Sequence, residues 1–288
     1  MVLLAAAGAV ALWGGAAVAG KIAVLDLPPL AVAALRTLLG GVLALPLALA
    51  GRIAWPRGHD QRGLLVLSAG GGFIGFPVAF SLGIAHTSAT HGAMILAFLP
   101  VMTGAIAQTW DRRPPRARWW IGCAVALAGE AVLVAWGSPG RTGHATSLYG
   151  DALVVLASLF AAIGYVAGGR LNRLGYPSQG ATYWGVVLAS LALLPALPWM
   201  LHGATWSMAT PWSLASLAYL AAGVTVLGYV LWYWALGQGG IARIGMLQFA
   251  QPIVGVVLAA IVLGEPLGAM VALAGTTILV GVWIASRS

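Results

Sequence analysis

Ionisable side chains are scarce in this chain, and two of them fall inside long apolar runs. Arg36 and Glu130 are each flanked by apolar residues. A charge in such a run is expensive to bury, so both are candidates for ion coupling or gating, with a fixed ion pair between them as the alternative. Lys21, near the end of the first run, is expected to extend toward a polar surface, and Asp151 to stabilise a helix start.

Amide and aromatic side chains form a second set of candidates. Gln248 and Gln251 lie three residues apart, and Tyr229 and Tyr233 lie four apart, so each pair shares one face of a helix. Pro252 is expected to kink its helix and free a carbonyl beside Gln251. Aromatic walls suit an apolar group, whereas hydroxyls and amides suit a carboxylate or ammonium; packing and interhelical hydrogen bonds are the alternatives. The predicted substrate-binding residues are Trp13, Phe80, His91, Tyr165, Tyr229, Tyr233, Gln248 and Gln251.

The remaining reactive side chains form no catalytic or metal-binding pattern. The five histidines are scattered, and Cys123 is the single cysteine, so the chain offers neither metal-ligand spacing nor an internal disulfide. The glycine-rich motif that holds nucleotide phosphates is also missing from the sequence. We therefore expect no catalytic residue, no metal and no cofactor.

The composition indicates a chain that lies within a membrane. Hydrophobic residues make up 61% of the sequence and charged residues 7%, whereas soluble domains carry roughly 25% charged residues. So few charges cannot cover a surface that faces water, so the outer surface must face lipid. The net charge of +8 is spread over short gaps between apolar runs, which argues against nucleic acid as a partner.

Apolar runs long enough to cross a bilayer recur along the whole chain. A spanning helix needs about 20 mostly apolar residues, and backbone polar groups in lipid must pair within the segment. The sequence therefore predicts an all-α integral membrane protein with ten transmembrane helices. The predicted spans are residues 2–19, 29–49, 63–85, 88–108, 119–137, 149–169, 180–200, 213–235, 241–262 and 267–285.

Lysine and arginine predict the orientation of these helices. With the N-terminus in the cytoplasm, eleven arginines fall on the cytoplasmic side, against Lys21 and Arg141 outside. This bias fits the positive-inside rule for an even number of helices. We predict a multi-pass protein of the bacterial inner (plasma) membrane, with its N- and C-termini in the cytoplasm.

Prolines indicate an internal repeat. Those at 28 and 46 recur 149 residues later, and those at 100 and 114 recur 152 residues later, so a small insertion separates the two pairs. Five helices in each half is an odd number, so the second copy must enter the membrane with opposite polarity. Such inverted repeats are typical of transporters that bind a substrate between their halves. We assign residues 1–140 to the first five-helix repeat and 141–288 to the second, around a central cavity.

Several short motifs follow one another in a recognisable order. They are Leu12-Trp13-Gly14, Pro28-Pro29, Leu35-Arg36, Ala97-Phe98-Leu99-Pro100-Val101, Gln251-Pro252 and Leu263-Gly264-Glu265-Pro266. With these motifs the chain resembles the drug/metabolite transporter superfamily, in its ten-helix EamA-type branch, and most of all the YddG-like amino-acid exporters. The resemblance implies two inverted repeats and a central cavity that opens by alternating access. The chain departs from the family at Arg113, where the first repeat often carries an acidic residue equivalent to Glu265.

The function predicted from these patterns is secondary transport. We expect export of amino acids, aromatic ones among them, or of similar small metabolites. The alternatives are a nucleotide-sugar or other metabolite or drug carrier of the same superfamily, a passive channel, and an integral-membrane enzyme that acts on lipid. The expected partners are the small-molecule substrate and the lipid bilayer, and the chain is expected to be a monomer or a weak homodimer.

Overall fold

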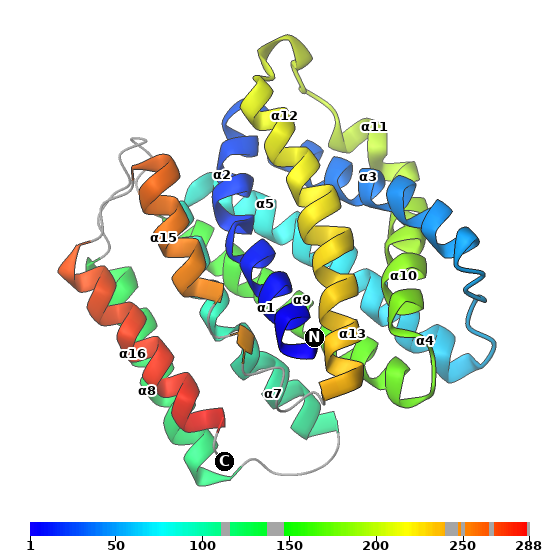
Figure 1. Cartoon of the computed structure of the whole chain (residues 1–288). Helices are drawn as coiled ribbons and strands as arrows, with labels where there is room; N and C mark the ends of the chain where they lie inside the picture. Colours follow the sequence, from blue (N-terminus) through cyan, green and yellow to red (C-terminus); the bar gives the residue numbers. More distant parts are fainter. Residues whose placement is uncertain (111–115, 137–146, 240–246, 249–250, 265–267, 287–288) are drawn as a thin grey trace.

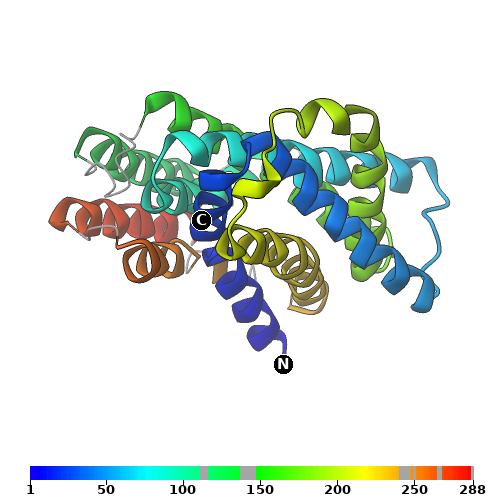
Figure 2. The ribbon, with the colours of Figure 1, turned by 90° about the horizontal axis from the view of Figure 1, so that it is seen from above.

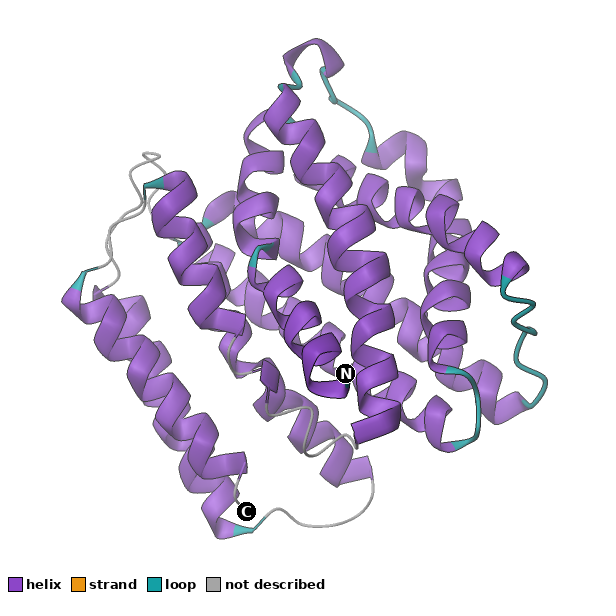
Figure 3. Ribbon diagram, viewed as in Figure 1, coloured by secondary structure: helices purple, strands orange, loops and turns teal. Residues whose placement is uncertain are grey.

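The structure is a computed structural model that describes residues 1–110, 116–136, 147–239, 247–248, 251–264 and 268–286. These residues fold into helices joined by short connections, and no β-strand occurs among them (Figure 3). Helices satisfy their own backbone hydrogen bonds, which is the requirement that lipid places on a spanning segment.

The first half of the chain contributes five helical stretches. The first is two helices in line, the third contains a π-helix, and the fourth contains a short 3-10 turn. In chain order the elements are α1 (Val2–Gly14), α2 (Ala16–Asp26), α3 (Pro29–Ala50), α4 (His59–Ser68), η1 (Ala69–Gly75), α5 (Phe76–His86), α6 (Ala89–Ile95), η2 (Leu96–Phe98), α7 (Leu99–Trp110) and α8 (Ala117–Trp136).

The second half contributes five more stretches. Its eighth span overall again contains a π-helix, and its seventh span contains a 3-10 turn. The elements are α9 (Leu148–Arg173), α10 (Ser178–Leu193), η3 (Leu194–Ala196), α11 (Leu197–Met200), η4 (Trp206–Met208), α12 (Pro211–Ala218), η5 (Tyr219–Gly228), α13 (Tyr229–Gly239), α15 (Gln251–Leu263) and α16 (Ala269–Ser286).

These stretches match the ten predicted spans. Seven are long and apolar enough to cross a membrane, α8 is a 20-residue helix, and the apolar parts of α15 and α16 are shorter. Four boundaries extend beyond the prediction by four residues or more: the first stretch continues to Asp26, the third begins at His59, α9 continues to Arg173, and α13 continues to Gly239. In the part of the predicted ninth span that precedes α15, residues 241–246 and 249–250 lie outside the described residues.

Helices of the two halves pack against each other in pairs. α3 packs on α10, α5 and η1 on α9, α1 on α13, α6 on α15, and α8 on α16. Figures 1 and 2 show α8 and α16 on one side of the bundle and α3 and α10 on the other. When each span is exchanged for its equivalent in the other half, the same pairs recur. This pattern is expected of two related halves, and their opposite insertion in the membrane stays a prediction.

Wide turns interrupt the third and eighth spans at equivalent places. η1 has 7 residues and η5 has 10. The step between the two proline offsets lies before these turns, because the starts of α3 and α10 differ by 149 residues and the starts of α4 and α12 already differ by 152. π-Helical turns are rare and frequent at functional sites. Side chains bond carbonyls here: Thr37 Oγ1 donates to Phe73 O at 2.9 Å, and Trp13 Nε1 donates to Val224 O at 3.1 Å.

Glycine brings α9 and η1 into backbone contact. A Cβ atom on Gly71 would lie 2.5 Å from the Phe160 carbonyl oxygen, and one on Gly164 would lie 2.7 Å from the Gly72 nitrogen. These separations leave no room for a side chain, so the close approach of the two helices depends on glycine. This close approach places the inward-facing side chains of α9 and of the third span next to one another.

Candidate functional site

Aromatic side chains from both halves meet where α1, α9, η1 and α13 pack together. Trp13 stacks on Tyr165 with ring centroids 5.5 Å apart and meets Tyr229 edge-on at 5.2 Å. Tyr229 in turn contacts Phe73 at 4.7 Å and Tyr233 at 5.7 Å. Every one of these rings is buried. We call the set the aromatic cluster, and its members are Trp13, Phe73, Tyr165, Tyr229, Trp232 and Tyr233.

The hydroxyl groups of the aromatic cluster are loosely held. Tyr229 Oη donates to Gly72 O at 3.4 Å, and Tyr233 Oη lies 3.4 Å from Ser68 Oγ. Hydroxyl hydrogen bonds are usually about 2.7–2.8 Å long. The contacts of Tyr229 and Tyr233 are thus longer than usual, while Tyr165 forms side-chain hydrogen bonds with Tyr229 and Gln248.

Arg36 extends from α3 to the edge of the aromatic cluster. Its Nε and Nη2 atoms donate to Thr225 Oγ1 at 3.3 and 3.2 Å, and its guanidinium lies 5.5 Å from the centre of the Phe76 ring. The side chain is 1% exposed, and Nη1 has no hydrogen-bond partner within the described part of the chain. A buried guanidinium with a free N–H edge is suited to an anionic group.

The contacts of Arg36 differ from the expected ion pair with Glu130. Arg36 is bonded to Thr225 on η5, and α8, which carries Glu130, lies on the opposite side of the bundle from α3 (Figures 1 and 2). The side chain of Glu130 itself lies outside the described residues, so its candidate role in coupling stays a prediction.

Phe80 and the two glutamines surround this region. Phe80 stacks on Phe76 with centroids 5.3 Å apart, which extends the aromatic surface beyond Arg36. Gln248 and Gln251 are 4% and 6% exposed. Gln248 Nε2 and Gln251 Oε1 have no partner among the residues that the structure describes. A buried polar atom without a partner is unfavourable, so a bound polar molecule that reaches these two atoms would stabilise both side chains.

The kink expected at Pro252 stays a prediction. α15 is described from Gln251 onward, and residues 249–250 directly before it lie outside the described residues.

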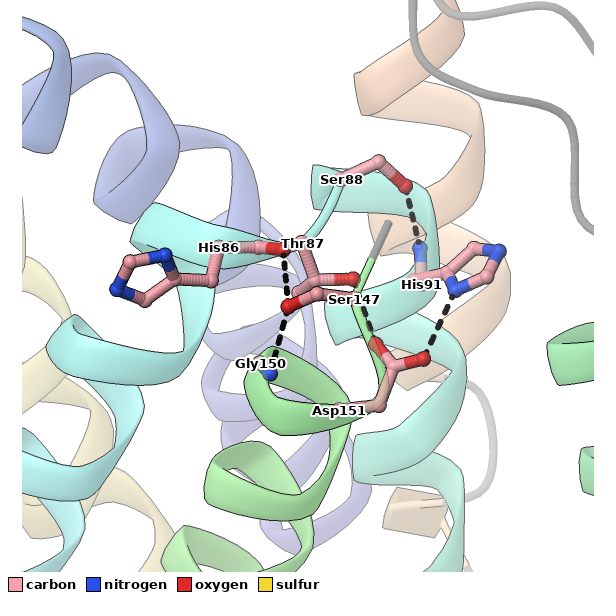
Figure 4. A network of polar contacts seen from close by, with 7 residues as sticks. All are labelled: His86, Thr87, Ser88, His91, Ser147, Gly150 and Asp151. Carbon is pink, nitrogen blue, oxygen red and sulfur yellow. Dashed lines mark hydrogen bonds and ion pairs between the residues drawn. The ribbon is translucent and has the colours of Figure 1, made fainter. Parts of the chain in front are cut away.

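His91 lies apart from the other predicted binding residues. Its Nδ1 atom lies 3.4 Å from Asp151 Oδ2, in a polar network at the junction of α5, α6 and α9 (Figure 4). The structure thus brings together Trp13, Tyr165, Tyr229 and Tyr233, places Arg36, Phe80, Gln248 and Gln251 around them or nearby, and separates His91 from this group.

Of two sequence expectations about charged residues, the one for Lys21 is wrong. Lys21 does not reach a surface: it is 1% exposed and donates from Nζ to Thr87 O at 2.7 Å. Asp151 lies in the first turn of α9, as expected for a carboxylate at a helix start, but the N-cap itself is Ser147, whose Oγ accepts the bond from the Gly150 amide. The Asp151 carboxylate accepts from Thr87 Oγ1 at 2.6 Å instead.

Thr225 is the contact that sequence reasoning missed. Its hydroxyl accepts two bonds from Arg36 and donates to Leu220 O at 2.8 Å, so it links the charge to the wide turn of η5. A threonine inside an apolar run is a signal, because its hydroxyl must find a partner in lipid. The sequence alone does not say which partner that is.

Both halves of the chain match the same known protein family. The EamA-like transporter family matches residues 1–135 and again residues 148–287. The chain belongs to the EamA-like transporter family. It is therefore a membrane transporter with the ten-helix fold of that family.

Relatives of this EamA-like transporter carry transporter names. A Bacillus subtilis (strain 168) protein named "Uncharacterized transporter YdeK" is 34% identical over 263 residues, which cover 90% of this chain and 88% of that protein. A protein of Streptantibioticus cattleyicolor named "Probable terminal-alkyne amino-acid exporter" is 27% identical over 232 residues, 81% of this chain and 75% of that one. A solved crystal structure with 19% identity superimposes with a TM-score of 0.70 over 99% of this chain and 96% of its own, which supports the fold alone.

Proposed function

We propose that this EamA-like transporter exports amino acids and that Arg36 holds their carboxylate group. The observation that carries the proposal is the buried guanidinium at the edge of the aromatic cluster. Its Nε and Nη2 atoms are fixed on Thr225, while Nη1 has no partner among the described residues. The name of the Streptantibioticus cattleyicolor relative supports the same substrate class.

The chemistry of Arg36 favours a carboxylate over other groups. Guanidinium presents planar N–H donors that match carboxylate oxygens, and such charge-assisted hydrogen bonds are stronger than neutral ones. An unpaired charge away from water is unfavourable. An anionic group that binds at Nη1 supplies the opposite charge, so its binding is favoured. The ammonium group of an amino acid could then lie against the ring faces of the tyrosines.

The aromatic cluster supplies a place for the substrate's side chain. Its rings touch one another in this structure, with Trp13 within 5.5 Å of Tyr165 and within 5.2 Å of Tyr229. A substrate side chain can enter only when these rings separate. Since Trp13 belongs to the first half and both tyrosines to the second, we infer that the halves move apart here, as alternating access requires.

Location and orientation complete the proposal. We infer a bacterial inner membrane protein with both termini in the cytoplasm and with residues 1–140 and 141–288 inserted in opposite directions, because its arginines concentrate on one side. Reporter fusions at the two ends should both be active only on the cytoplasmic side. Ends found on opposite sides would overturn this topology.

Counterflow into proteoliposomes tests the substrate class. Vesicles loaded with an unlabelled amino acid should accumulate the same labelled amino acid, whereas the carboxamide derivative, which lacks the negative charge, should not exchange. Arg36→Lys should weaken this selection, because ammonium lacks the planar donors, and Arg57→Lys at an exposed loop position is the matched control. Equal exchange of acid and amide would refute Arg36 as the anchor, and exchange of a nucleotide sugar alone would refute the amino-acid proposal.

A further inference from the structure

A second buried polar group lies outside the aromatic cluster. We call it the His91–Asp151 network, and it consists of Lys21, Thr87, His91 and Asp151. Figure 4 shows the last three of these residues. All four residues are at most 5% exposed. They come from α2, the junction of α5 and α6, α6 itself and α9, so the network joins the first half of the chain to the second. With the N-terminus in the cytoplasm, these helix ends lie on the outer side.

The hydrogen bonds of the network place Asp151 as an acceptor. Thr87 Oγ1 donates to Oδ1 at 2.6 Å, a length typical of a hydroxyl bound to a carboxylate. A carboxylate can only accept, so the proton between Asp151 Oδ2 and His91 belongs to His91 Nδ1. The other ring nitrogen, Nε2, is then an acceptor. It is buried, has no partner among the described residues, and points away from Asp151 in Figure 4.

The separation of His91 from Asp151 leaves room for a stronger contact. Nδ1 and Oδ2 are 3.4 Å apart, whereas a charged N–H donor and a carboxylate usually come within about 2.7–2.9 Å. A proton that binds Nε2 would turn the imidazole into a cation and this long hydrogen bond into an ion pair. The start of α9 would then be held more firmly against α6.

The same helix start is already tied to the end of α5. Ser147 donates from its amide and its hydroxyl to His86 O at 3.2 and 3.1 Å. A Cβ atom on Gly150 would lie 2.8 Å from the His86 carbonyl carbon, so the two backbones touch. A tighter bond between His91 and Asp151 therefore acts on a contact that must open before solutes can pass at this end.

The other ionisable groups around His91 are few. From α2 it is faced by Lys21, whose Nζ is bound to the carbonyl oxygens of Ile84 and Thr87. On α5, His86 directs its ring away from the network and packs on Tyr149 of α9 at 5.4 Å. The described residues of α15, α7 and η2 carry no ionisable side chain. α8 carries Glu130, whose side chain lies outside the described residues.

We propose that His91 Nε2 is a proton-binding site and that the bound proton closes the outer end of the transporter. One N–H bond forms at Nε2 when a proton arrives from the outer aqueous phase, and the same bond breaks when the proton leaves; no other covalent bond changes. In an exporter, a proton that closes the outer end after the substrate has left would link proton entry to substrate exit. This proposal rests on the proposed transport function, but its test does not require a substrate.

Thiol labelling can measure the closure directly. Val154 on α9 is fully buried against Gly83 of α5, and Leu148 on the same helix is 74% exposed. We would replace Cys123, the only cysteine, by alanine and introduce Val154→Cys or Leu148→Cys. The ratio of the two labelling rates with a maleimide corrects for the effect of pH on thiol reactivity. This ratio should fall about tenfold between about pH 8 and about pH 5, the effect of one hydrogen bond becoming charged.

Separate substitutions of His91 and His86 show which histidine causes the pH response. Asparagine at position 91 can still donate to Asp151 but cannot take up a proton, so His91→Asn should make the ratio independent of pH. His86→Asn, at the end of α5 and five residues earlier in the chain, should leave the response intact. Asp151→Asn provides a second variant, and it should also abolish the response because the cation has no carboxylate to pair with.

Three results would overturn the proposal. They are a ratio that does not change with pH in the parent, a response that survives in both His91→Asn and Asp151→Asn, and a response lost in Glu130→Gln but kept in His91→Asn. If the labelling response is present while amino-acid counterflow is not, the proton site stands and only the proposed substrate is wrong.

Discussion

The aromatic cluster and the His91–Asp151 network are both buried, and both join the two halves of the chain, but they are held by different forces. The cluster is closed by ring contacts and by hydroxyl bonds of 3.4 Å, such as that of Tyr229. The network is closed by bonds of 2.6 and 2.7 Å at Thr87. Ring contacts can be exchanged for a molecule of similar shape, whereas a charged contact changes only when its charge changes. One region is therefore suited to respond to a solute and the other to a proton.

Removing the charge of Arg36 should have the largest effect on transport. In Arg36→Gln the carboxylate loses its partner, and we expect counterflow at low substrate concentration to fall by about a hundredfold, as for other buried charged contacts. The pH response of the outer end should remain, because Arg36 is not part of the His91–Asp151 network. Arg57→Gln, at an exposed position, serves as the control. Unchanged counterflow in Arg36→Gln would remove the distinction between the two regions.

Opening the aromatic cluster should have the next largest effect. Trp13→Ala removes one stacked ring pair and the hydrogen bond to Val224 O, and we expect about a thirtyfold loss of counterflow. Trp13→Phe keeps the ring and should lose less. Trp212→Ala, where the indole is 76% exposed, is the comparison that separates cluster loss from the loss of any tryptophan. A Trp212 variant as impaired as Trp13→Ala would contradict the assignment.

A smaller change is expected from the amide beside the cluster. Gln251→Ala should reduce counterflow about fivefold, the effect of one neutral hydrogen bond to the substrate. Thermal unfolding in detergent should hardly change, because Oε1 has no partner among the described residues. Gln61→Ala, an exposed glutamine bonded to Leu174 O, is the control. A large loss of stability with normal counterflow would show that Gln251 serves packing.

The smallest effect is expected outside both regions. Tyr176, in the connection between α9 and α10, donates to Ala54 O at 2.8 Å, and Tyr176→Phe should lower the free energy of unfolding by about 1 kcal/mol without altering transport. Burial raises the pKa of Tyr176 to about 12, above the usual value of about 10. The unfolded chain therefore ionises first, so this stabilising contribution is complete below about pH 10 and is lost as the pH rises to about 12. Thermal unfolding scans of the parent and Tyr176→Phe should converge at alkaline pH.

The sequence predicted the spans well because apolar length alone determines them. It also grouped much of the aromatic cluster, since Tyr229 and Tyr233 lie four residues apart and must share a helix face. It could not predict the partners of charged residues. The position of Lys21 near the end of an apolar run does not show that α5 and α6 cover it, and the depth of Arg36 does not show that Thr225 faces it.

Local geometry limited the remaining predictions. The first stretch continues to Asp26 instead of ending at residue 19, because the pattern of apolar residues does not define a helix boundary to that accuracy. The wide turns of η1 and η5 gave no signal in the pattern of apolar residues. Those turns expose the carbonyls that Trp13 and Thr37 bind.

The unequal wide turns also bear on how the eighth span could move. Successive residues of an α-helix are about 100° apart around its axis, because 3.6 residues make a turn. A wide turn that moves past a residue therefore turns that residue about the helix axis by roughly that angle, while the helix on either side keeps its orientation. Tyr229 begins α13 directly after η5, so a wide turn that moved past it would swing its ring out of line with Trp13 while the far end of the span stays in place.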